Sequence, residues 1–384
     1  MNILQHNGFY GVKLAFCLFK YFPYGGLQRD FMRIAKECLR RGHQVDVFTM
    51  HWDGEFEPGI SVKLLIVPGK QNHTRTRQFA ALVQQQIAHY DLVVGFNKMP
   101  GLDVYYAADT CYQAKARALR PVWYRWTPRY RQLVAAESAV FNSDLKTEIL
   151  LIAKAQQDDF NRYYATQAER FHLLPPGIAK DRVAPVNAAD IRLQTRQALG
   201  IEDDELLLLL VGSGFKTKGL DRAILGLAAL PDELRSKAHL YIVGKDNPKR
   251  FQRQAKKLGI IEQIHFLGGR DDIPQLLLAG DLLLHPAYNE NTGTVLLEAL
   301  VAGLPVLTTD VCGYAHYVLD AHAGFVMASP FQQAQFNQAL VSMLRSPERA
   351  KWQANAITFS KTADIYSMPV CAVDLLESFK EAKS

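Results

Sequence analysis

The sequence predicts an α/β protein of two doubly wound domains, each with helices on both faces of a parallel sheet, facing each other across a cleft. Apolar runs of strand length alternate with segments of helical periodicity along most of the chain. The alternation begins again after a Pro-Pro-Gly stretch at residues 175–177, which is typical of a linker. At 384 residues the chain is also longer than one hydrophobic core usually organises.

The first half contains four apolar runs that we expect as strands, at residues 12–19, 44–50, 62–68 and 91–97. A helix is expected between the first two. Its apolar face has side chains at helical spacing, namely Leu27, Phe31, Ile34, Cys38 and Leu39. Gly42 is placed to end this helix.

The second half contains five further runs expected as strands, at residues 205–214, 238–244, 263–269, 281–287 and 304–309. Segments of helix length separate them, as parallel strands require. Residues 294–303 read as an apolar helix, and residues 369–384 as an amphipathic helix with a solvated tail. Ligands of such sheets bind beyond the carboxyl ends of the strands, so polar residues that follow strands are the candidates for a site.

Positive charge is concentrated in the first half of the chain. Residues 1–178 hold 22 Lys and Arg against 15 Asp and Glu, whereas the remainder holds 22 against 23. An anionic partner is therefore expected on the N-terminal side.

Cysteine usage and the terminal segments indicate a cytosolic protein. The five cysteines are scattered without a C-x-x-C pair, which indicates reduced thiols that mostly pack as small apolar side chains. No apolar run reaches the roughly 18 residues of a membrane-spanning helix. The first residues lack the features of a signal peptide and are expected to form a tail that leads into the first strand.

The segment HPAYNENTGTVLLEALVAGLPVLTT, residues 285–309, places Glu290 and Glu298 on either side of a small polar turn. The turn consists of Asn291, Thr292 and Gly293. It falls at the start of the expected helix, where N–H groups and the helix dipole favour a phosphate. Glu298 is placed to accept from two ribose hydroxyls, and Glu290 to reach a sugar beyond the phosphate, which fits a ribose–diphosphate–sugar ligand. The alternative is one capping acid and one surface acid.

A glycine–lysine loop, VGSGFKTKGLDRA at residues 211–223, follows another expected strand. Its glycines, Gly212, Gly214 and Gly219, allow the chain to approach a ligand closely. Lys216 and Lys218 project from it and could clamp a leaving diphosphate. The loop is not a Walker A sequence, and exposed turns of this composition are common.

The segment KYFPYGGLQRD, residues 20–30, offers a second close-approach loop with Gly25 and Gly26. It lacks G-x-G-x-x-G, which argues against a dinucleotide oxidoreductase. Asp30, in the first helical turn, either complements the dipole or contacts substrate hydroxyls. Three polar residues after the strand at 91–97 are candidates for contacts with an acceptor: Asn97, Lys98 and Asp103.

Residues 115–131 form a basic and aromatic segment without an acid. Its cations are Lys115, Arg117, Arg120, Arg125, Arg129 and Arg131, and its aromatic residues are Trp123, Tyr124, Trp126 and Tyr130. This composition favours an anionic bilayer surface, to which each cation contributes roughly 1 kcal/mol. Two alternatives remain, a single-stranded RNA site and a loop whose aromatic residues pack inward.

These motifs resemble family 4 retaining glycosyltransferases of the GT-B fold, which has two Rossmann-like domains. The resemblance is carried by Glu290 and Glu298 with TGTVLLEALVAGLPVLTT, by the glycine–lysine loop and by the N-terminal Gly-Gly. Within this family, AFCLFKYFPYGGLQRDFMRIA, GFNKMPGLDVYYAAD and LLLHPAY with VCGYAHY resemble lipopolysaccharide core glucosyltransferases. The similarity covers nearly all of the chain after about ten residues. It implies transfer of glucose from UDP-glucose to an inner-core heptose of lipopolysaccharide, at the cytoplasmic face of the inner membrane.

The resemblance also implies domains and residue roles. Residues 1–176 would bind the acceptor, residues 177–365 the nucleotide sugar, and residues 366–384 would form a helix that crosses back to the first domain. Glu298 would bind the ribose and Glu290 the donor sugar. The other implied donor contacts are Gly25, Gly26, Ser213, Lys216, Lys218, Gly269, Arg270, Asn291, Thr292, Gly293 and Thr294. Of these, Lys218 would neutralise the diphosphate, and the backbone at Gly269 and Arg270 would read the uracil.

The chain departs from the family pattern at Ser213, where relatives have an arginine, and Lys216 is the nearest substitute. No histidine matches the one that some relatives use near the sugar. His285 and His316 are instead expected in the core or behind the residues that contact the ligand.

The expected mechanism uses neither a metal ion nor a cofactor. The chain has no D-x-D metal motif in its candidate sites, and lysines with helix N–H groups can replace a divalent ion. Retention without a placed nucleophile favours front-face attack, in which a phosphate oxygen takes the proton of the acceptor hydroxyl. Glu290 would orient the sugar, and Lys218 and Asp30 are the other catalytic candidates.

Two other functions fit the same motifs. One is a GT-B transferase with another nucleotide sugar or acceptor, because the glutamate pair would survive that change. The other is a non-catalytic, basic protein that binds nucleotides at a membrane. The expected partners are a UDP-sugar, a lipopolysaccharide acceptor and an anionic membrane, without nucleic acid.

Overall fold

The computed structural model describes residues 11–23, 25–69 and 71–383. The tail expected at residues 1–10 lies outside them. The chain divides into two compact units: unit 1 runs to Gly177 and resumes at Ser367, and unit 2 is Ile178–Tyr366. No helix among the described residues is long and apolar enough to cross a bilayer.

Unit 1 contains a seven-stranded sheet in the order β3-β2-β1-β4-β5-β6-β7, in which every neighbouring pair is parallel. Its strands are β1 Lys13–Cys17, β2 Gln44–Thr49, β3 Ile60–Leu64, β4 Leu92–Gly95, β5 Val104–Ala107, β6 Glu148–Leu151 and β7 Phe171–Leu173. Its helices are α1 Gly26–Arg40, α2 Asn72–Gln84, α3 Tyr112–Leu119, α4 Pro128–Phe141, α5 Gln156–Tyr164 and α15 Met368–Lys383, with 3₁₀ turns η1 Val122–Trp126 and η2 Ala168–Arg170.

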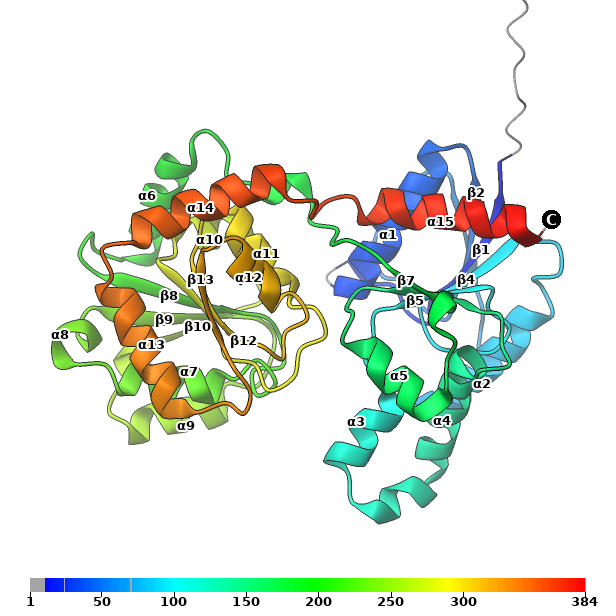
Figure 1. Ribbon diagram of the computed structural model, residues 1–384, viewed down its shortest axis with the longest axis horizontal. Coiled ribbons are helices and arrows are strands. Elements are labelled where there is room, and N and C mark those ends of the chain that lie inside the picture. The colour runs from blue at the N-terminus through cyan, green and yellow to red at the C-terminus, as the bar shows by residue number, and fades with distance from the viewer. Residues whose placement is uncertain (1–10, 24, 70, 384) are drawn as a thin grey trace, which may run out of the picture. The chain divides into compact units, whose positions relative to one another are not determined.

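Successive side chains of the central strands of unit 1 enter two separate cores, as the period of a strand requires. In β1, Leu14 and Phe16 pack with α1 and α15. Ala15 and Cys17 point to the other face and pack with α2, α4 and α5. Helices therefore cover both faces of this sheet (Figure 1).

Unit 2 contains a six-stranded parallel sheet in the order β10-β9-β8-β11-β12-β13. Its strands are β8 Leu206–Val211, β9 Ala238–Val243, β10 Ile264–Gly268, β11 Leu282–His285, β12 Val306–Thr309 and β13 Gly324–Met327. Its helices are α6 Ala188–Leu199, α7 Leu220–Ala228, α8 Asp232–Arg235, α9 Lys249–Lys257, α10 Ile273–Ala279, α11 Thr294–Val301, α12 Ala315–Asp320, α13 Gln333–Arg345 and α14 Arg349–Thr362, with 3₁₀ turns η3 Lys180–Arg182 and η4 Ile261–Gln263.

The leucine run of β8 is apolar without interruption because both of its faces are covered. Leu207 and Leu209 pack with α10, α11 and α12. Leu208 and Leu210 pack on the other face with α7, α9 and α13. The prediction of two doubly wound parallel sheets is confirmed, whereas the cleft between them stays a prediction.

The strand orders place a switch point in each sheet, between β1 and β4 in unit 1 and between β8 and β11 in unit 2. Connections that leave adjacent strands in opposite directions open a crevice at the carboxyl edge, which is the usual ligand position of such sheets. In unit 2 the loops at this point are residues 212–219 and 286–293, and both carry predicted site residues.

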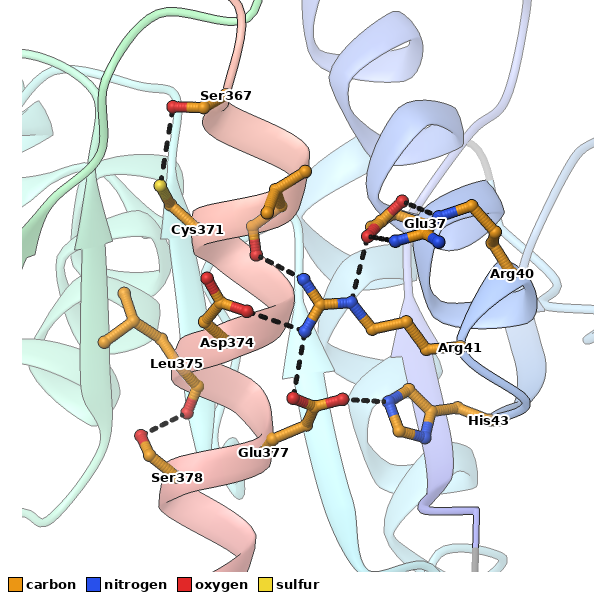
Figure 2. A network of polar contacts seen from close by, with 11 residues as sticks. Glu37, Arg40, Arg41, His43, Ser367, Cys371, Asp374, Leu375, Glu377 and Ser378 are labelled. Carbon is orange, nitrogen blue, oxygen red and sulfur yellow. Dashed lines mark hydrogen bonds and ion pairs between the residues drawn. The ribbon is translucent and has the colours of Figure 1, made fainter. Parts of the chain in front are cut away.

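The C-terminal helix α15 packs on α1 of unit 1 and is fixed there by a charged network (Figure 2). Arg41 donates to Asp374 at 2.6 Å, to Glu377 at 2.9 Å and to Glu37 at 2.9 Å. Glu377 also contacts His43 at 2.9 Å. Arg41 is 17% exposed and contacts three carboxylates, so its ion pairs hold a fixed geometry better than an isolated surface pair does.

The chain enters α15 beside the point at which it left unit 1. The backbone N–H of Met368 donates to the carbonyl of Pro176 at 3.2 Å, and that of Ile178 donates to the carbonyl of Ile365 at 2.9 Å.

All five cysteines are free thiols, and Cys371 alone among them is not buried, which confirms their prediction as packed, unpaired thiols.

Candidate active site

The two switch-point loops of unit 2 lie in direct contact. The backbone N–H of Tyr288 donates to the carbonyl of Thr217 at 2.8 Å. Gly219 has φ +77°, and a Cβ at this position would lie 1.9 Å from the carbonyl oxygen of Pro286. Only glycine fits both the conformation and this approach. The loop contact therefore fixes Lys218, the residue that precedes this glycine.

Lys218 and Glu290 form an ion pair between the two loops. Their side chains are 20% and 14% exposed. Burial lowers the pKa of the Lys218 ammonium, against a smaller opposite effect of Cys312. The pair thus places one cation and one anion at the carboxyl edge of the sheet, with most of their surface removed from water.

His285 stands behind Glu290, at the end of β11. Its side chain is fully buried, and its Nε2 lies 3.4 Å from Glu290 Oε2. Burial, with the charge of Lys218, lowers the pKa of His285 to about 3, so the ring is neutral near pH 7 and its contact with Glu290 is a hydrogen bond. Its Nδ1 has no partner among the described residues. The expectation that His285 packs behind the site is confirmed, whereas His316 is exposed.

The loop that carries Glu290 is also held from the other side. Glu290 pairs with Cys312 in a parallel β-bridge, and the carbonyl of Thr292 accepts from the N–H of Tyr314 at 2.7 Å. The position of the Glu290 carboxylate is therefore set by backbone contacts as well as by Lys218 and His285.

Helix α11 begins beside this pair. Gly293 is its N-cap, with φ +81°, and a Cβ there would lie 3.4 Å from Glu290 Cγ. The first turn contains no acid, so the positive end of the helix dipole is not neutralised by a side chain of that turn. Glu298 is 8% exposed and lies four residues after Thr294, which places both on one face of α11. Asn291 and Thr292 lead into the helix, as predicted.

Lys216 does not join Lys218 in the structure. Its ammonium donates to Asp221 at 2.6 Å and lies 4.0 Å from the ring centre of Tyr288. Burial opposes its charge, but Asp221 and Tyr288 together raise the pKa of Lys216. Ser213 is exposed, and its Oγ accepts from the backbone N–H of Lys245 at 3.1 Å.

Gly269 and Arg270 follow β10 at the same edge of the sheet. A Cβ at Gly269 would lie 2.6 Å from Cε of Lys245, so the lysine stem covers this backbone. The Arg270 side chain forms an ion pair with Asp272. The uracil contact of this backbone, which the resemblance implies, stays a prediction.

Gly25 and Gly26 lie at the start of α1 in unit 1, whereas Asp30 lies in the second turn rather than in the first turn expected from the sequence, because the helix already begins at Gly26. Gly25 is the N-cap, where a Cβ would lie 1.9 Å from Gln28 Oε1, whereas a Cβ on Gly26 would meet open space. Tyr106 donates to Asp30 at 2.9 Å, and Arg33 lies 3.6 Å from it. Burial nevertheless raises the pKa of Asp30 to about 6, against both of these contacts.

The three acceptor candidates separate in the structure. Asn97 stays at the carboxyl edge, where its Oδ1 accepts from the N–H of Phe19 at 2.8 Å and joins the loops after β1 and β4. Lys98 instead forms an ion pair with the fully buried Glu137 and donates to the carbonyl of Thr110 at 3.0 Å. It therefore has a structural partner of opposite charge.

The structure corrects the expected position of Asp103. It accepts from the N–H of Val93 at 2.8 Å and pairs with Lys383 at 2.7 Å. Asp103 directly precedes β5, and consecutive parallel strands require the chain to return to the amino edge before the next strand starts. This aspartate accordingly lies at the edge opposite to Asn97.

The basic and aromatic segment comprises most of α3, η1 and the start of α4. Trp123 and Trp126 are 60% and 68% exposed, so these rings do not pack inward. Tyr124 and Tyr130 turn toward the protein: Tyr130 is buried, and the Tyr124 hydroxyl lies 3.0 Å from that of Tyr112. The cations are exposed except Arg125, which is half-buried; they are Lys115, Arg117, Arg120, Arg125, Arg129 and Arg131.

Comparisons with known proteins show the family of the chain. Residues 24–182 match the family model described as Glycosyltransferase Family 4, and residues 192–359 match the model described as Glycosyl transferases group 1. The chain is 48% identical over 366 residues to the lipopolysaccharide glucosyltransferase WaaG of Escherichia coli (strain K12), across 94% of this chain and 98% of that protein. The chain belongs to the WaaG family of GT-B glycosyltransferases.

Solved structures support the assignment of the fold. A crystal structure of WaaG, a glycosyltransferase involved in lipopolysaccharide biosynthesis, has a TM-score of 0.88 and covers 94% of this chain and 99% of its own. Anabaena Alr3699/HepE in complex with UDP-glucose has a TM-score of 0.75 at 21% identity, across 96% of this chain and 100% of its own, so it is similar in fold alone.

Sequence reasoning missed the partners that fix the lysines of this glycosyltransferase. Asp221 and Tyr288 hold Lys216, and Cys312 pairs with the strand-like backbone of Glu290. Asp221 lies in the same segment as Lys216, at the start of α7, whereas Tyr288 and Cys312 come from other loops of unit 2 that no local pattern connects to it. The glycine–lysine loop was the only sequence feature that indicated such contacts. Its glycines predict that another segment lies close to the loop, but they do not identify that segment.

Proposed function

We propose that this glycosyltransferase moves glucose from UDP-glucose to an inner-core heptose of lipopolysaccharide, with retention of configuration. The observation that carries the proposal is the Lys218–Glu290 pair beside the first turn of α11, with Glu298 in the next turn of the same helix. The 48% identity to a lipopolysaccharide glucosyltransferase supports the choice of donor sugar and acceptor class.

The donor would lie along α11. Its diphosphate would occupy the N-terminus of the helix, where Thr292, Gly293 and Thr294 offer backbone and hydroxyl groups. Lys218 would exchange part of its contact with Glu290 for a phosphate oxygen. Glu298 would accept from the ribose hydroxyls. A lysine and helix N–H groups stabilise the charge of a leaving diphosphate, so the reaction is proposed to need no metal ion.

In the proposed reaction the bond from the anomeric carbon to the UDP oxygen breaks, and a bond to the acceptor oxygen forms on the same face. The proton of the acceptor hydroxyl passes to a phosphate oxygen of the leaving UDP. Glu290, held by Lys218 and His285, would orient the glucose ring rather than attack it. Asp30, whose pKa is raised to about 6, would contact acceptor hydroxyls from unit 1.

Transfer of radiolabelled glucose from UDP-glucose to heptose-terminated lipopolysaccharide tests this function. Glu290→Gln is expected to lower kcat about 100-fold with a smaller change in the KM of UDP-glucose, because it weakens an interaction of the transition state. Full turnover of Glu290→Gln would contradict the role. A panel of nucleotide sugars in a thermal-shift assay tests the donor, since the donor should stabilise the protein most. If another nucleotide sugar stabilises the protein more, that sugar replaces UDP-glucose as the proposed donor. Binding of the donor without transfer would favour a non-catalytic protein.

We also propose that the basic and aromatic segment holds the enzyme on the cytoplasmic face of the inner membrane. Exposed tryptophans beside exposed cations suit the interface of an anionic bilayer. Trp123→Ser with Trp126→Ser should reduce co-sedimentation with vesicles that contain anionic lipid. Phe56→Ser, which removes an aromatic ring of similar exposure elsewhere in unit 1, should not. Binding that is indifferent to anionic lipid content would contradict the proposal.

A further inference from the structure

Two hollows adjoin in unit 1 along α2. The first has a volume of about 320 Å³ and is lined by Lys20, Asn72, Arg75 and Asn97, among others. The second has a volume of about 370 Å³ and includes Asn72 and Arg129. Because Asn72 and Thr76 line both, the two hollows form one continuous surface, which we call the α2 trough.

One end of the α2 trough lies at the switch point of the sheet. Phe19 and Asn97 follow β1 and β4, the two strands that flank this point, and both line the first hollow. Asn97 uses its Oδ1 to accept from Phe19, so its amide nitrogen remains a donor at the hollow. A ligand at this end would lie where doubly wound sheets place the reacting group.

The other end of the α2 trough lies at the first turn of α4. Arg129 belongs to that turn and lines the second hollow. The same turn follows the exposed Trp126 of the basic and aromatic segment. The trough therefore runs from the strand ends toward the part of unit 1 that is proposed to face the membrane.

The charge of the α2 trough has one sign. Lys20, Arg75 and Arg129 line it, and no carboxylate does. Within the described part of the chain, none of these three forms an ion pair with an acid. Arg75 donates its Nε to the carbonyl of Val67 at 3.3 Å, which orients the guanidinium and leaves its terminal nitrogens as donors. Like charges in a concave surface repel one another and attract anions.

We propose that the α2 trough binds the acidic part of the acceptor glycan. Arg75 and Lys20 would hold one anionic group near the strand ends, and Arg129 a second group farther along. Guanidinium groups bind carboxylates and phosphates in the same bidentate manner, so sugar carboxylates and phosphate esters share this chemistry. The assignment rests on the proposed function, because it concerns the acceptor of that reaction.

Arg75→Gln and Arg77→Gln make a matched pair for the test. Both remove one positive charge from α2, but residues two apart point to nearly opposite sides of a helix. Arg77 lines a further hollow, between α2 and α4, which meets the α2 trough at His73 and Thr76 but includes none of its three cations. Arg75→Gln is expected to raise the KM of the lipopolysaccharide acceptor about 10-fold or more, as loss of a charge-assisted hydrogen bond does. The kcat and the KM of UDP-glucose should change less than about twofold, and Arg77→Gln should match the wild type.

Modified acceptors distinguish the two sources of charge. One acceptor lacks phosphate esters, and another has its sugar carboxylates reduced to alcohols. The effect of Arg75→Gln should shrink on whichever acceptor lacks the recognised group. An effect that is undiminished on both acceptors, or an equal effect of Arg77→Gln, would overturn the assignment.

A binding experiment separates this inference from the proposed function. Tri-galacturonate, a soluble acidic glycan, is titrated into the enzyme with UDP at saturation, so that the nucleotide site is blocked. The wild type should bind it in a salt-dependent manner, and Arg75→Gln with Arg129→Gln should bind at least about 10-fold more weakly. If the wild type transfers no glucose to any lipopolysaccharide, the proposed function fails while this titration still tests the trough. Equal binding by wild type and double variant would refute the trough.

Discussion

Replacing Asp30 by Asn should stabilise the protein at neutral pH. Burial raises the pKa of Asp30 from 3.8 to about 6, so the folded state binds its proton more tightly than the unfolded state does. The ionised carboxylate therefore disfavours folding above pH 6, and this cost disappears as the pH falls toward 3.8. Asparagine removes the charge and keeps an oxygen that can accept from Tyr106.

The magnitude follows from the two pKa values. Their difference corresponds to about 3 kcal/mol at pH 7.5 and about half of that at pH 5. The side chain of Asp30 is 26% exposed, so solvent screening makes about 3 kcal/mol an upper limit. The pH dependence is the more specific expectation: the advantage of Asp30→Asn should fall by about 1 kcal/mol between pH 7.5 and pH 5.

Urea unfolding at both pH values, followed by tryptophan fluorescence, measures this difference. Trp52 reports on the region, because its ring packs against Tyr21 and Phe31 of the same core as α1. If Asp30 serves the reaction, the variant should be more stable and less active, since catalytic groups are often kept at a cost in stability. A variant that is less stable than the wild type at pH 7.5, or equally affected at both pH values, would refute the reasoning.

Two further predictions concern single positions. Gly219→Ala should lower the stability of unit 2 and weaken UDP binding, because the added Cβ meets the backbone of Pro286. Gly214→Ala is the control, since Gly214 has a similar φ of +78° and a Cβ there has no atom nearer than 4.0 Å. Thermal unfolding and UDP titration measure the two effects. Equal effects of the two changes would show that the loop contact is unimportant. Glu137→Gln should destabilise unit 1 by about 3 kcal/mol or more, because it leaves the Lys98 ammonium without its counter-charge. Thermal denaturation measures this loss of stability. Adding Lys98→Met to Glu137→Gln should recover part of the loss, because it removes the unpaired ammonium. A loss below about 1 kcal/mol for Glu137→Gln would contradict the prediction.

The long apolar runs predicted the fold, and the short ones did not. The run at 205–214 became β8 because five consecutive buried residues, 207–211, distinguish a covered strand from a turn. Strands β5, β6, β7 and β13 were not predicted, because their three or four residues are too few for a period to show. Strands β4, β11 and β12 are as short but were predicted from longer apolar runs that contain them. The run at 62–68 was expected as a strand, but β3 ends at Leu64 and Ile66 is 91% exposed. Beyond the strand the apolar side chains of this run diverge, since Val67 is buried in the core that contains α2 whereas Ile66 faces solvent.

Site residues were predictable where the signal was local. Gly219 and Gly293 lie in loops whose composition indicates a close approach, and both have positive φ. The pairing of Lys218 with Glu290 joins positions 72 residues apart, which depends on the strand order rather than on either motif. The misplacement of Asp103 has the same origin, because its edge of the sheet is decided by β5, which the pattern did not reveal.

The return of the chain to unit 1 through α15 affects how the protein folds during synthesis. Unit 2 is continuous in sequence, so every strand of its sheet can emerge from the ribosome before the final helix is made. Unit 1 buries Met368, Ala372, Val373 and Leu376 of that helix against its own strands. Its core therefore stays incomplete until residues beyond 366 have been translated. Domains usually fold in order from the N-terminus. In this protein, however, unit 1 is the first to be synthesised and the last to complete its fold.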